Sequence, residues 1–337
     1  MSYQWFIGID VSKQTLDITI LNNNEKKMYE QIINSDQSIK SFLKKLVSDQ
    51  KILLHDCLFC LEHTGIYNSH FLKVMEEKKL AVCLESSVQI KQSGGLLRGK
   101  NDKVDSYRIA LYAFKNKEFL TLCQPERTVI SHLRRLSGIR ERLLNARKQI
   151  SNIIKEDKKF IDKESSAQMM KCCKQSIKAL EEDIKKTEEE IKKVIDKDEK
   201  LKELFLIIES VPGVGKITAT EIVINTNEFK KINDPRKYAC YAGIAPFEHS
   251  SGTSVRGKTR TSKKANMKAK SLLHMTALVA ARFSDDLREY YERKVAEGKN
   301  KMNVLNAVKN KIIHRIFACV NQKRLYEKNY KYCLVES

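Results

Sequence analysis

The middle of the chain carries two runs of apolar residues at alternating spacings of three and four. Such spacing places one apolar stripe along a helix and is typical of coiled coils. A polar break over 155–166 separates the runs, so we expect an antiparallel helical hairpin or a rod that dimerises. The first run is Leu136, Ile139, Leu143, Ala146, Ile150 and Ile153, and the second is Ile177, Leu180, Ile184, Thr187, Ile191 and Val194.

The residues before this region alternate between strand and helix signals. Three short apolar or alternating segments come first, and strand and helix patterns then take turns, which predicts a mixed sheet with helices on its faces. Ser35 or Asp36 can cap a helix to about Ser48, and Gly65 leads into another. The expected strands are 5–11, 15–21, 27–33, 57–61 and 80–84.

The residues from Leu204 onward predict a mainly helical region. Two apolar segments flank a short glycine turn at 211–215, which is the pattern of a helix-hairpin-helix element. The segment 243–257 is the richest in turn residues, and we expect a loop there. We therefore divide the chain into domains at 1–122, 123–205 and 206–325, with a tail at 326–337.

Charge and composition narrow the class of protein. The 337 residues carry a net charge of +21, and 42% are hydrophobic, which argues against wholesale disorder. No apolar stretch approaches the ~18 residues of a membrane-spanning helix, and no signal segment begins the chain. Nine scattered cysteines make a disulfide framework improbable. We expect a reduced cytoplasmic protein with no membrane partner.

The positive charge is concentrated near the C-terminal end. Between Glu248 and Asp285 the chain has no acidic residue. A stretch of one sign beside folded sequence is typical of a surface that binds a phosphate backbone, although a solvated basic surface is the simpler alternative. The cations of this stretch are Arg256, Lys258, Arg260, Lys263, Lys264, Lys268, Lys270 and Arg282.

Four carboxylates occupy positions where a metal site can form. Asp10 ends the first predicted strand, and Glu62 follows the buried strand at 57–61. Asp102 and Asp105 lie three apart where a helix is predicted to begin, so they share one helix face. Strand-end carboxylates facing such a pair could hold two divalent cations beside a scissile phosphate. A helix cap at Asp102 and a solvent-facing Glu62 are the alternatives.

Other polar residues have simpler interpretations. Cys57, Cys60 and His63 have the spacing of a zinc motif, but residues three apart on a strand point to opposite faces, so we interpret the cysteines as buried and inert. Asp17 and Glu85 lie near predicted strands, and we interpret them as surface or structural groups.

Two glycine-containing turns are candidates for contact with phosphate. The turn before Lys216 contains Gly213 and Gly215 and can present backbone N–H groups to one phosphate, or it is an ordinary helix connection. Ser251 precedes Gly252 beside the basic stretch, where a hydroxyl could attack a phosphodiester. An ordinary surface turn is the alternative for this serine.

The chain resembles the DEDD transposases of the insertion sequence one-hundred-and-ten family, which are RNA-guided recombinases. Six motifs appear in the order of that family, and the resemblance extends from about Tyr3 to Val320. The motifs are Phe6-Ile-Gly-Ile-Asp10-Val-Ser-Lys13, Leu61-Glu62-His-Thr-Gly65, Lys100-Asn-Asp102-Lys-Val-Asp105, Val211-Pro-Gly-Val-Gly215, Ala242-Gly-Ile-Ala-Pro246 and Ser251-Gly252.

The resemblance implies a fold and a chemistry. It implies a RuvC-like, ribonuclease-H-type α/β domain at the N-terminus, an antiparallel coiled-coil insertion for assembly and RNA holding, and a mainly helical C-terminal transposase domain. Asp10, Glu62, Asp102 and Asp105 would bind Mg²⁺, and Ser251 would form a phosphoserine link to cleaved DNA. The active site would be shared between protomers of a dimer or tetramer, and a bridge RNA would pair with donor and target DNA.

Three other functions are compatible with parts of the pattern. A metal-dependent nuclease or Holliday-junction resolvase would need the carboxylates but not Ser251. A sugar-kinase-like ATPase would need a second glycine-rich phosphate loop, which the helical C-terminal half does not offer. A non-catalytic nucleic-acid scaffold would tolerate loss of all four carboxylates and still bind with salt-dependent affinity.

Overall fold

The structure is a computed structural model that describes residues 3–22, 25–93, 101–157, 160, 162–251, 255–261 and 265–328. Its residues form two compact units, Met1–Pro125 and Glu126–Ser337, which are described separately below. The second unit contains both the long central helices and the helices that follow them. The finer division at residues 122, 205 and 325 stays a prediction.

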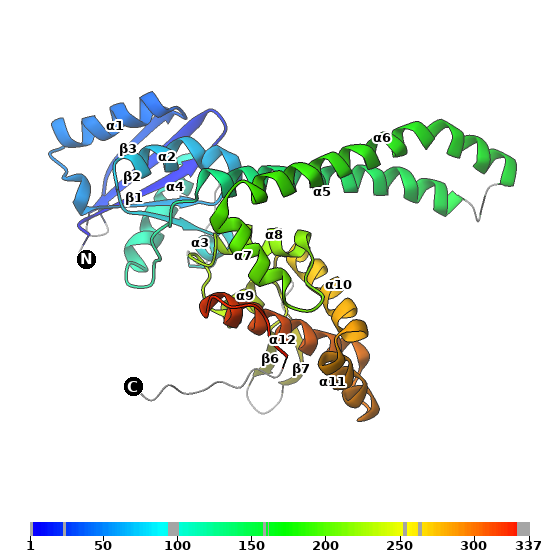
Figure 1. The fold of residues 1–337 in the computed structure, drawn as a ribbon. Coiled ribbons are helices and arrows are strands. Elements are labelled where there is room, and N and C mark those ends of the chain that lie inside the picture. Colours follow the sequence, from blue (N-terminus) through cyan, green and yellow to red (C-terminus); the bar gives the residue numbers. More distant parts are fainter. Residues whose placement is uncertain are drawn as a thin grey trace, which may run out of the picture. The chain divides into compact units, whose positions relative to one another are not determined.

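A five-stranded sheet forms the centre of the first unit (Figure 1). Its order is β3-β2-β1-β4-β5, with β2 antiparallel to β1 and β3. The strands β1, β4 and β5 run parallel. This meander followed by parallel strands confirms the expected ribonuclease-H-type mixed sheet. The strands are β1 (Trp5–Val11), β2 (Thr15–Asn22), β3 (Glu25–Ile33), β4 (Cys57–Glu62) and β5 (Val82–Glu85).

Helices cover both faces of this sheet. On one face, α1 (Asp36–Ser48) and α2 (Ser69–Glu77) pack their apolar sides against alternate residues of β1, β2 and β4. On the other face lies α4 (Asp102–Lys115). Short helical segments occupy Leu54–Asp56, Gly65–Asn68 and Ser87–Ser93 (α3). Because side chains alternate along a strand, residues two apart on β1 face the same layer of helices.

The helix α1 forms where its sequence predicts it. The Ser35 hydroxyl accepts a hydrogen bond from the Ser38 backbone N–H and so caps the helix. The four apolar residues of its predicted inner face are all buried. They are Ile39, Phe42, Leu43 and Leu46.

A glycine on β1 lets α4 lie close to the sheet. A Cβ atom at Gly8 would lie 2.2 Å from the Ala110 backbone nitrogen and 2.3 Å from the Ser106 carbonyl oxygen. Both atoms belong to the helix backbone and cannot move aside cheaply. Gly8 therefore fixes how closely the first turns of α4 approach the end of β1.

The central helices form an antiparallel hairpin (Figure 1). They are α5 (Thr128–Asp157) and α6 (Lys163–Asp196). Arg140 pairs with Glu188 at 2.6 Å and Arg147 with Glu181 at 3.4 Å. Residue numbers rise by seven on α5 while they fall by seven on α6, which requires antiparallel helices. Of the two expected arrangements, the intramolecular hairpin is confirmed.

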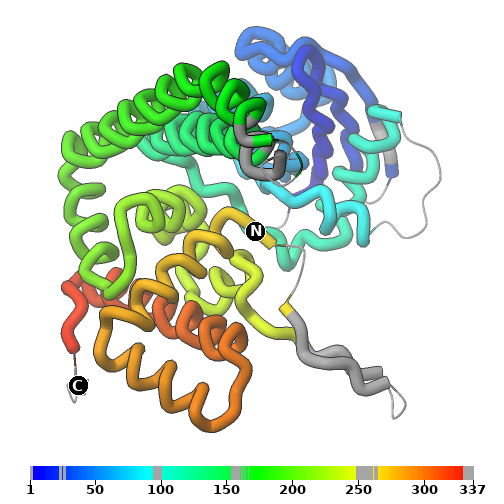
Figure 2. The backbone as a smooth tube through the Cα atoms, turned by 90° about the vertical axis from the view of Figure 1, so that its right-hand side faces the viewer, coloured from blue at the N-terminus to red at the C-terminus, as the bar shows by residue number. Residues whose placement is uncertain are grey.

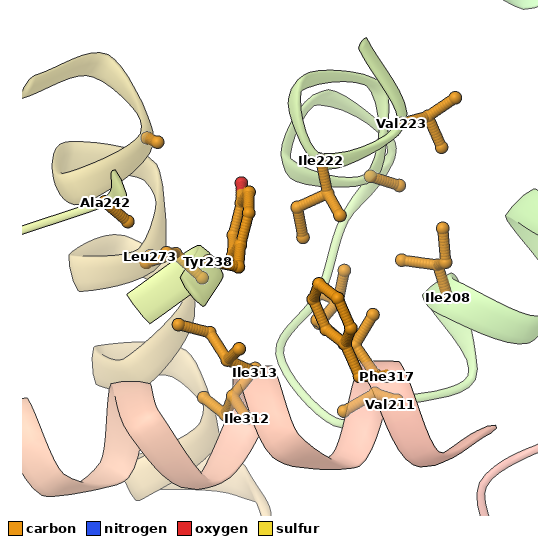
Figure 3. Packing of buried hydrophobic residues seen from close by; sticks show 14 of the residues in the cluster. Ile208, Val211, Ile222, Val223, Tyr238, Ala242, Leu273, Ile312, Ile313 and Phe317 are labelled. Atoms are coloured by element: carbon orange, nitrogen blue, oxygen red, sulfur yellow. The ribbon is translucent and has the colours of Figure 1, made fainter. Parts of the chain in front are cut away.

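The remainder of the second unit is mainly helical, as expected. Tyr238 and Phe317 lie at the centre of its core, where their ring centroids are 5.7 Å apart (Figure 3). Its elements are α7 (Glu199–Glu209), α8 (Lys216–Thr226), α9 (Pro235–Tyr241), β6 (Pro246–Ser251), β7 (Val255–Thr261), α10 (Met267–Phe283), α11 (Asp285–Ala296) and α12 (Lys301–Asn321).

The prediction of a loop at 243–257 is wrong in part, because β6 and β7 form an antiparallel hairpin there. The segment is rich in Ser, Gly and Thr, which are typical of turns, and its strand pairing does not show as an apolar alternation.

In the described part of the chain, no helix has the length and apolar character needed to cross a bilayer.

Candidate active site

Asp10 and Glu62 come together at the carboxyl ends of neighbouring parallel strands. Strands β1 and β4 pair in register up to Ile9 and Leu61, and the two carboxylates are the next residues along each strand. Both side chains belong to the α4 face, because Ile9 and Leu61 pack in the core under α1 and α2. The sheet therefore presents these two carboxylates side by side, as predicted.

Asp102 and Asp105 begin α4 above this edge of the sheet. The Asn101 side chain accepts a hydrogen bond from the Lys103 N–H at 3.0 Å and caps the helix, so Asp102 is not the cap. Both carboxylates lie in the first turn, three residues apart. The buried Ser106 hydroxyl contacts the Thr19 hydroxyl of β2 at 2.8 Å and holds this turn on the sheet.

The electrostatics of Asp10 show that the four carboxylates form one cluster. Burial, followed by the charges of Asp105, Asp102 and Glu62 in that order, raises the pKa of Asp10 to about 6. The influence of one charge on the pKa of another weakens with distance, so these carboxylates lie near Asp10. The structure thus brings all four predicted residues into one electrostatic site.

This donor set fits a hard divalent cation. Such ions bind carboxylate oxygens, and a bound cation would relieve the repulsion that raises the pKa of Asp10. Among the described side chains, no three His, Cys, Asp or Glu groups are already arranged around one point as ligands. Arg108 instead pairs with Asp105, Nη1 to Oδ1 at 2.8 Å. Side-chain rotation is therefore needed to close a coordination shell.

Asp17 is a fifth carboxylate on this face, and the sequence interpretation of it as a possible surface group is wrong. It lies opposite Asp10 in the β1–β2 ladder, is 2% exposed, and also raises the pKa of Asp10. The Tyr29 hydroxyl donates to Asp17 at 2.5 Å and the Gln31 amide at 3.1 Å. The hairpin register of 5–11 with 15–21 could have revealed its position.

Glu85 extends the same edge of the sheet. It is the register partner of Glu62, and its backbone carbonyl accepts from the His63 N–H at 3.0 Å. Burial and the charge of Glu85 raise the pKa of Tyr112 on α4 to about 12. Glu85 is therefore tied to α4 as well as to β4, which supports its interpretation as a structural group.

The cysteines of β4 are buried and do not converge. Cys57 packs in the core on the α1 side of the sheet and Cys60 in the core on the α4 side. Burial raises the pKa of Cys57 to about 12 and that of Cys60 well above its ordinary value. The predicted burial of these thiols is confirmed, and their inertness stays a prediction.

The second unit carries the predicted serine on the β6–β7 hairpin. Ser251 is the last residue of β6 and pairs with Val255, and Ser250 pairs with Arg256. Gly252, Lys263 and Lys264 lie outside the described residues. For Ser251, Arg256, Lys258 and Arg260, the description covers the backbone.

The predicted glycine turn connects α7 to α8. Gly213 has a φ of +83°, and a Cβ there would lie 2.6 Å from the Thr276 carbonyl oxygen. Gly215 precedes Lys216 and caps α8 without a side-chain hydrogen bond. The N–H groups of the first turn are thus not capped by a side chain, an arrangement that suits a phosphate.

Comparisons with known proteins match both units. A model of the DEDD transposases of IS110 type matches residues 7–156. A second model, of the IS116/IS110/IS902 transposase family, matches residues 206–292. The chain belongs to the IS110 family of transposases. The first match contains the four carboxylates, and the second contains the glycine turn and Ser251.

Individual relatives within and around the IS110 family are distant. An uncharacterized protein of insertion element IS116 from Streptomyces clavuligerus is 28% identical over 39% of this chain and 34% of its own length. A pilin gene-inverting protein from Moraxella bovis is 24% identical over 36% of this chain and 38% of its own. The aligned part thus spans about a third of the curated relatives.

One solved structure is also similar. It is the structure of T. thermophilus RuvC in complex with Holliday junction substrate, whose sequence is 11% identical to this chain. The match covers 36% of this chain and all of that chain, with a TM-score of 0.29. The fold assignment above rests on the strand order and not on this likeness.

Proposed function

We propose that this IS110-family chain is a DNA transposase or recombinase that excises and inserts a mobile element. The observation that carries the proposal is the carboxylate cluster around Asp10, in which three neighbouring carboxylates and burial raise one pKa to about 6. A protein gains no stability by gathering like charges at a strand edge. Their assembly indicates a bound cation as the missing counter-charge.

In this proposal the four carboxylates hold Mg²⁺. Bound divalent cations stabilise the charge that develops on a scissile phosphate. The residues of the chain supply the geometry: β1 and β4 fix Asp10 and Glu62, and α4 carries Asp102 and Asp105. The Ser106–Thr19 contact and Gly8 keep the start of α4 close to the strands.

Ser251 is the proposed nucleophile. Its hydroxyl oxygen forms a bond to phosphorus, and a deoxyribose oxygen of the cleaved strand leaves with a proton. Rejoining reverses the same step with the other DNA strand. The resemblance to the family supports a site in which the carboxylates and the serine come from different protomers of a dimer or tetramer. The α5–α6 hairpin is the element proposed for assembly.

Nucleic acid is the proposed partner of the basic surface. Gly213, Gly215 and Lys216 are proposed to bind a phosphate at the start of α8. Donor DNA, target DNA and a guide RNA are the ligands, and base pairing with the RNA selects the DNA sequence. The remaining proposed nucleic-acid contacts are Arg256, Lys258, Arg260, Lys263 and Lys264.

The test is the formation of a covalent protein–DNA adduct. The full chain is purified from cells that carry its flanking DNA, supplied with Mg²⁺, and run on a denaturing gel. Wild type should form the adduct, while Asp10→Asn and Ser251→Ala should form none. The matched controls Glu76→Gln and Ser271→Ala change an exposed carboxylate and an exposed serine, and both variants should still form the adduct.

The other outcomes of these tests would favour an alternative function or contradict one part of the proposal. DNA cleavage by Ser251→Ala, together with its loss in Asp10→Asn, would indicate a metal-dependent nuclease without serine chemistry. Unchanged adduct formation by Asp10→Asn would contradict the carboxylate site. Sequencing of co-purified RNA tests guidance, because a discrete RNA encoded beside the gene is expected and random cellular RNA would contradict it.

A further inference from the structure

The helices α10 and α12 pack against each other and carry no acidic residue. The sequence contains no Asp or Glu over 267–283 or 301–321. The helices of this region lie side by side in the tube view (Figure 2). Any cation on their shared surface must therefore find its counter-charge on another element or on a ligand.

One lysine of α10 finds that counter-charge inside the protein. Lys268 lies 2.6 Å from the buried carboxylate of Glu221 on α8 and 3.1 Å from Glu141 on α5. Its ammonium also donates to the Ser137 hydroxyl at 2.8 Å. Lys268 is thus a structural cation and does not contribute to the basic surface that the sequence indicates.

Lys309 of α12 is the opposite case. The residue is 5% exposed, and no hydrogen bond or ion pair joins its ammonium to another residue in the described part of the chain. Its Nζ is not among the described side-chain atoms that are fully enclosed without a hydrogen-bond partner, so the ammonium keeps a small exposed surface. Burying an unpaired ammonium is costly. The cost indicates an anion that is not part of this chain.

Two groups of α10 are coupled electrostatically to Lys309 across the packing of α10 against α12. Lys270 and His274 are one helical turn apart and share a face. Burial and the charge of Lys270 lower the pKa of Lys309, and burial and the charge of Lys309 lower the pKa of His274. The Lys270 ammonium also donates to the Thr261 hydroxyl at the end of β7, at 3.1 Å.

We propose that Lys309, Lys270 and His274 bind one backbone phosphate of the nucleic acid on which the transposase acts. The hydrogen bond from Lys270 to Thr261 links this phosphate to the β6–β7 hairpin that carries Ser251. The proposal rests on the proposed function, since it takes its ligand from there. A phosphate supplies the negative charge that α10 and α12 lack and accepts hydrogen bonds from all three groups.

The first test uses inorganic phosphate as the probe and thermal unfolding as the readout. Lys309→Met keeps the length of the side chain and removes the ammonium, so it should unfold at a temperature about 2–4 °C higher in chloride. Phosphate at matched ionic strength should raise the melting temperature of wild type and leave that of Lys309→Met unchanged. Lys301→Met, an exposed change on the same helix, should behave like wild type.

The second test measures duplex DNA affinity against salt concentration. Removal of one phosphate contact should flatten the slope of log K against log salt by about 1 and weaken binding about eightfold at ~0.1 M salt. Lys301→Met should keep the wild-type slope. A phosphate response without a change in slope would mean that free phosphate is the ligand, and would overturn the proposal.

A lower melting temperature of Lys309→Met with an unchanged phosphate response would also overturn the proposal, because Lys309 would then have a structural role. These results are separable from failure of the proposed function. Adduct formation depends on Asp10 and Ser251, so loss of adduct in the Asp10 variant together with an unaltered Lys309 slope would refute only this site.

Discussion

The two units of the molecule each gather like charges, with opposite signs. In the first unit, burial and neighbouring carboxylates raise the pKa of Asp10 to about 6. In the second unit, burial and Lys270 lower the pKa of Lys309. Both shifts mean that the surrounding protein disfavours the charged form. In our proposals each cluster binds a ligand of the opposite sign, a cation in one case and an anion in the other.

Each unit also contains a buried charge that has its own partners. Asp17 accepts hydrogen bonds from Tyr29 and Gln31, and the buried carboxylate of Glu221 pairs with the half-buried ammonium of Lys268. Asp17 lies directly opposite Asp10 in the β1–β2 ladder, and Lys268 lies on α10, the helix that packs against the α12 of Lys309. The comparison teaches that burial alone does not mark a ligand site. A buried charge marks such a site when the protein supplies no partner for it.

The largest expected effect on stability comes from breaking a partnered charge. Glu221→Gln should lower the free energy of unfolding by about 2 kcal/mol, because the half-buried ammonium of Lys268 then loses its closest counter-charge. Denaturant unfolding measures the change. The double variant Glu221→Gln with Lys268→Met should recover most of the lost stability. A Glu221→Gln variant as stable as wild type would contradict the contrast between partnered and unpartnered charges.

Removing an unpartnered charge should have the opposite sign. Asp10→Asn should stabilise the metal-free protein at pH 8 by about 1 kcal/mol, after allowance for solvent screening. The folded-state pKa of about 6 lies above the ordinary 3.8. The stability contributed by protonated Asp10 is thus complete below the lower value and lost as the pH rises through the higher one.

The pH dependence makes this second prediction specific. The stabilisation by Asp10→Asn should vanish near pH 4 and grow between pH 4 and 7, as followed by thermal unfolding with a chelator present. Glu76→Gln, which changes an exposed carboxylate of the same unit, should show no such trend. A destabilised Asp10→Asn variant at pH 8 would contradict the assignment of Asp10 as an unpartnered charge.

An effect of similar size and opposite sign is expected for Asp17→Asn. Its hydrogen bond and charge raise the pKa of Tyr29 to about 12, so the variant should move the pKa of Tyr29 towards its ordinary value of 10.0. Loss of the charged acceptor should cost about 1 kcal/mol. Carbon-13 labelled tyrosine reports the titration by NMR, with Tyr29→Phe assigning the signal. An unchanged pKa of Tyr29 in Asp17→Asn would contradict the hydrogen bond between Tyr29 and Asp17.

The smallest effect belongs to an exposed pair on the coiled coil. Arg147 and Glu181 are 3.4 Å apart, and their side chains are 39% and 55% exposed. Glu181→Gln should change the free energy of unfolding by less than about 0.5 kcal/mol. Denaturant unfolding at low and high salt tests this. A loss as large as that of Glu221→Gln would mean that burial does not decide the value of an ion pair here.

The sequence predicted well what depends on local pattern. The five strands and the capped helix α1 follow from apolar spacing and from Ser35. The cluster around Asp10 was predictable because parallel strands end at one edge and Asp102 and Asp105 begin one helix. That inference needed only strand direction and helix periodicity.

What the sequence did not reveal depends on pairing between distant segments. The polar β6–β7 hairpin has no apolar alternation, so it was expected as a loop. Asp17 was interpreted as a surface or structural group because its burial depends on Tyr29 and Gln31 of the next strand. Lys268 and Lys309 are both lysines on apolar helices, and the packing of α5 and α8 beside Lys268 distinguishes them.

The most direct test of the central claim is calorimetric titration of Mn²⁺ into the metal-free protein. Wild type and Glu76→Gln should bind the ion, and Asp10→Asn and Asp105→Asn should lose most of that binding, because the cluster supplies the ligands. Equal binding by wild type and the two cluster variants, or no binding by wild type, would contradict a cation site at the carboxylates.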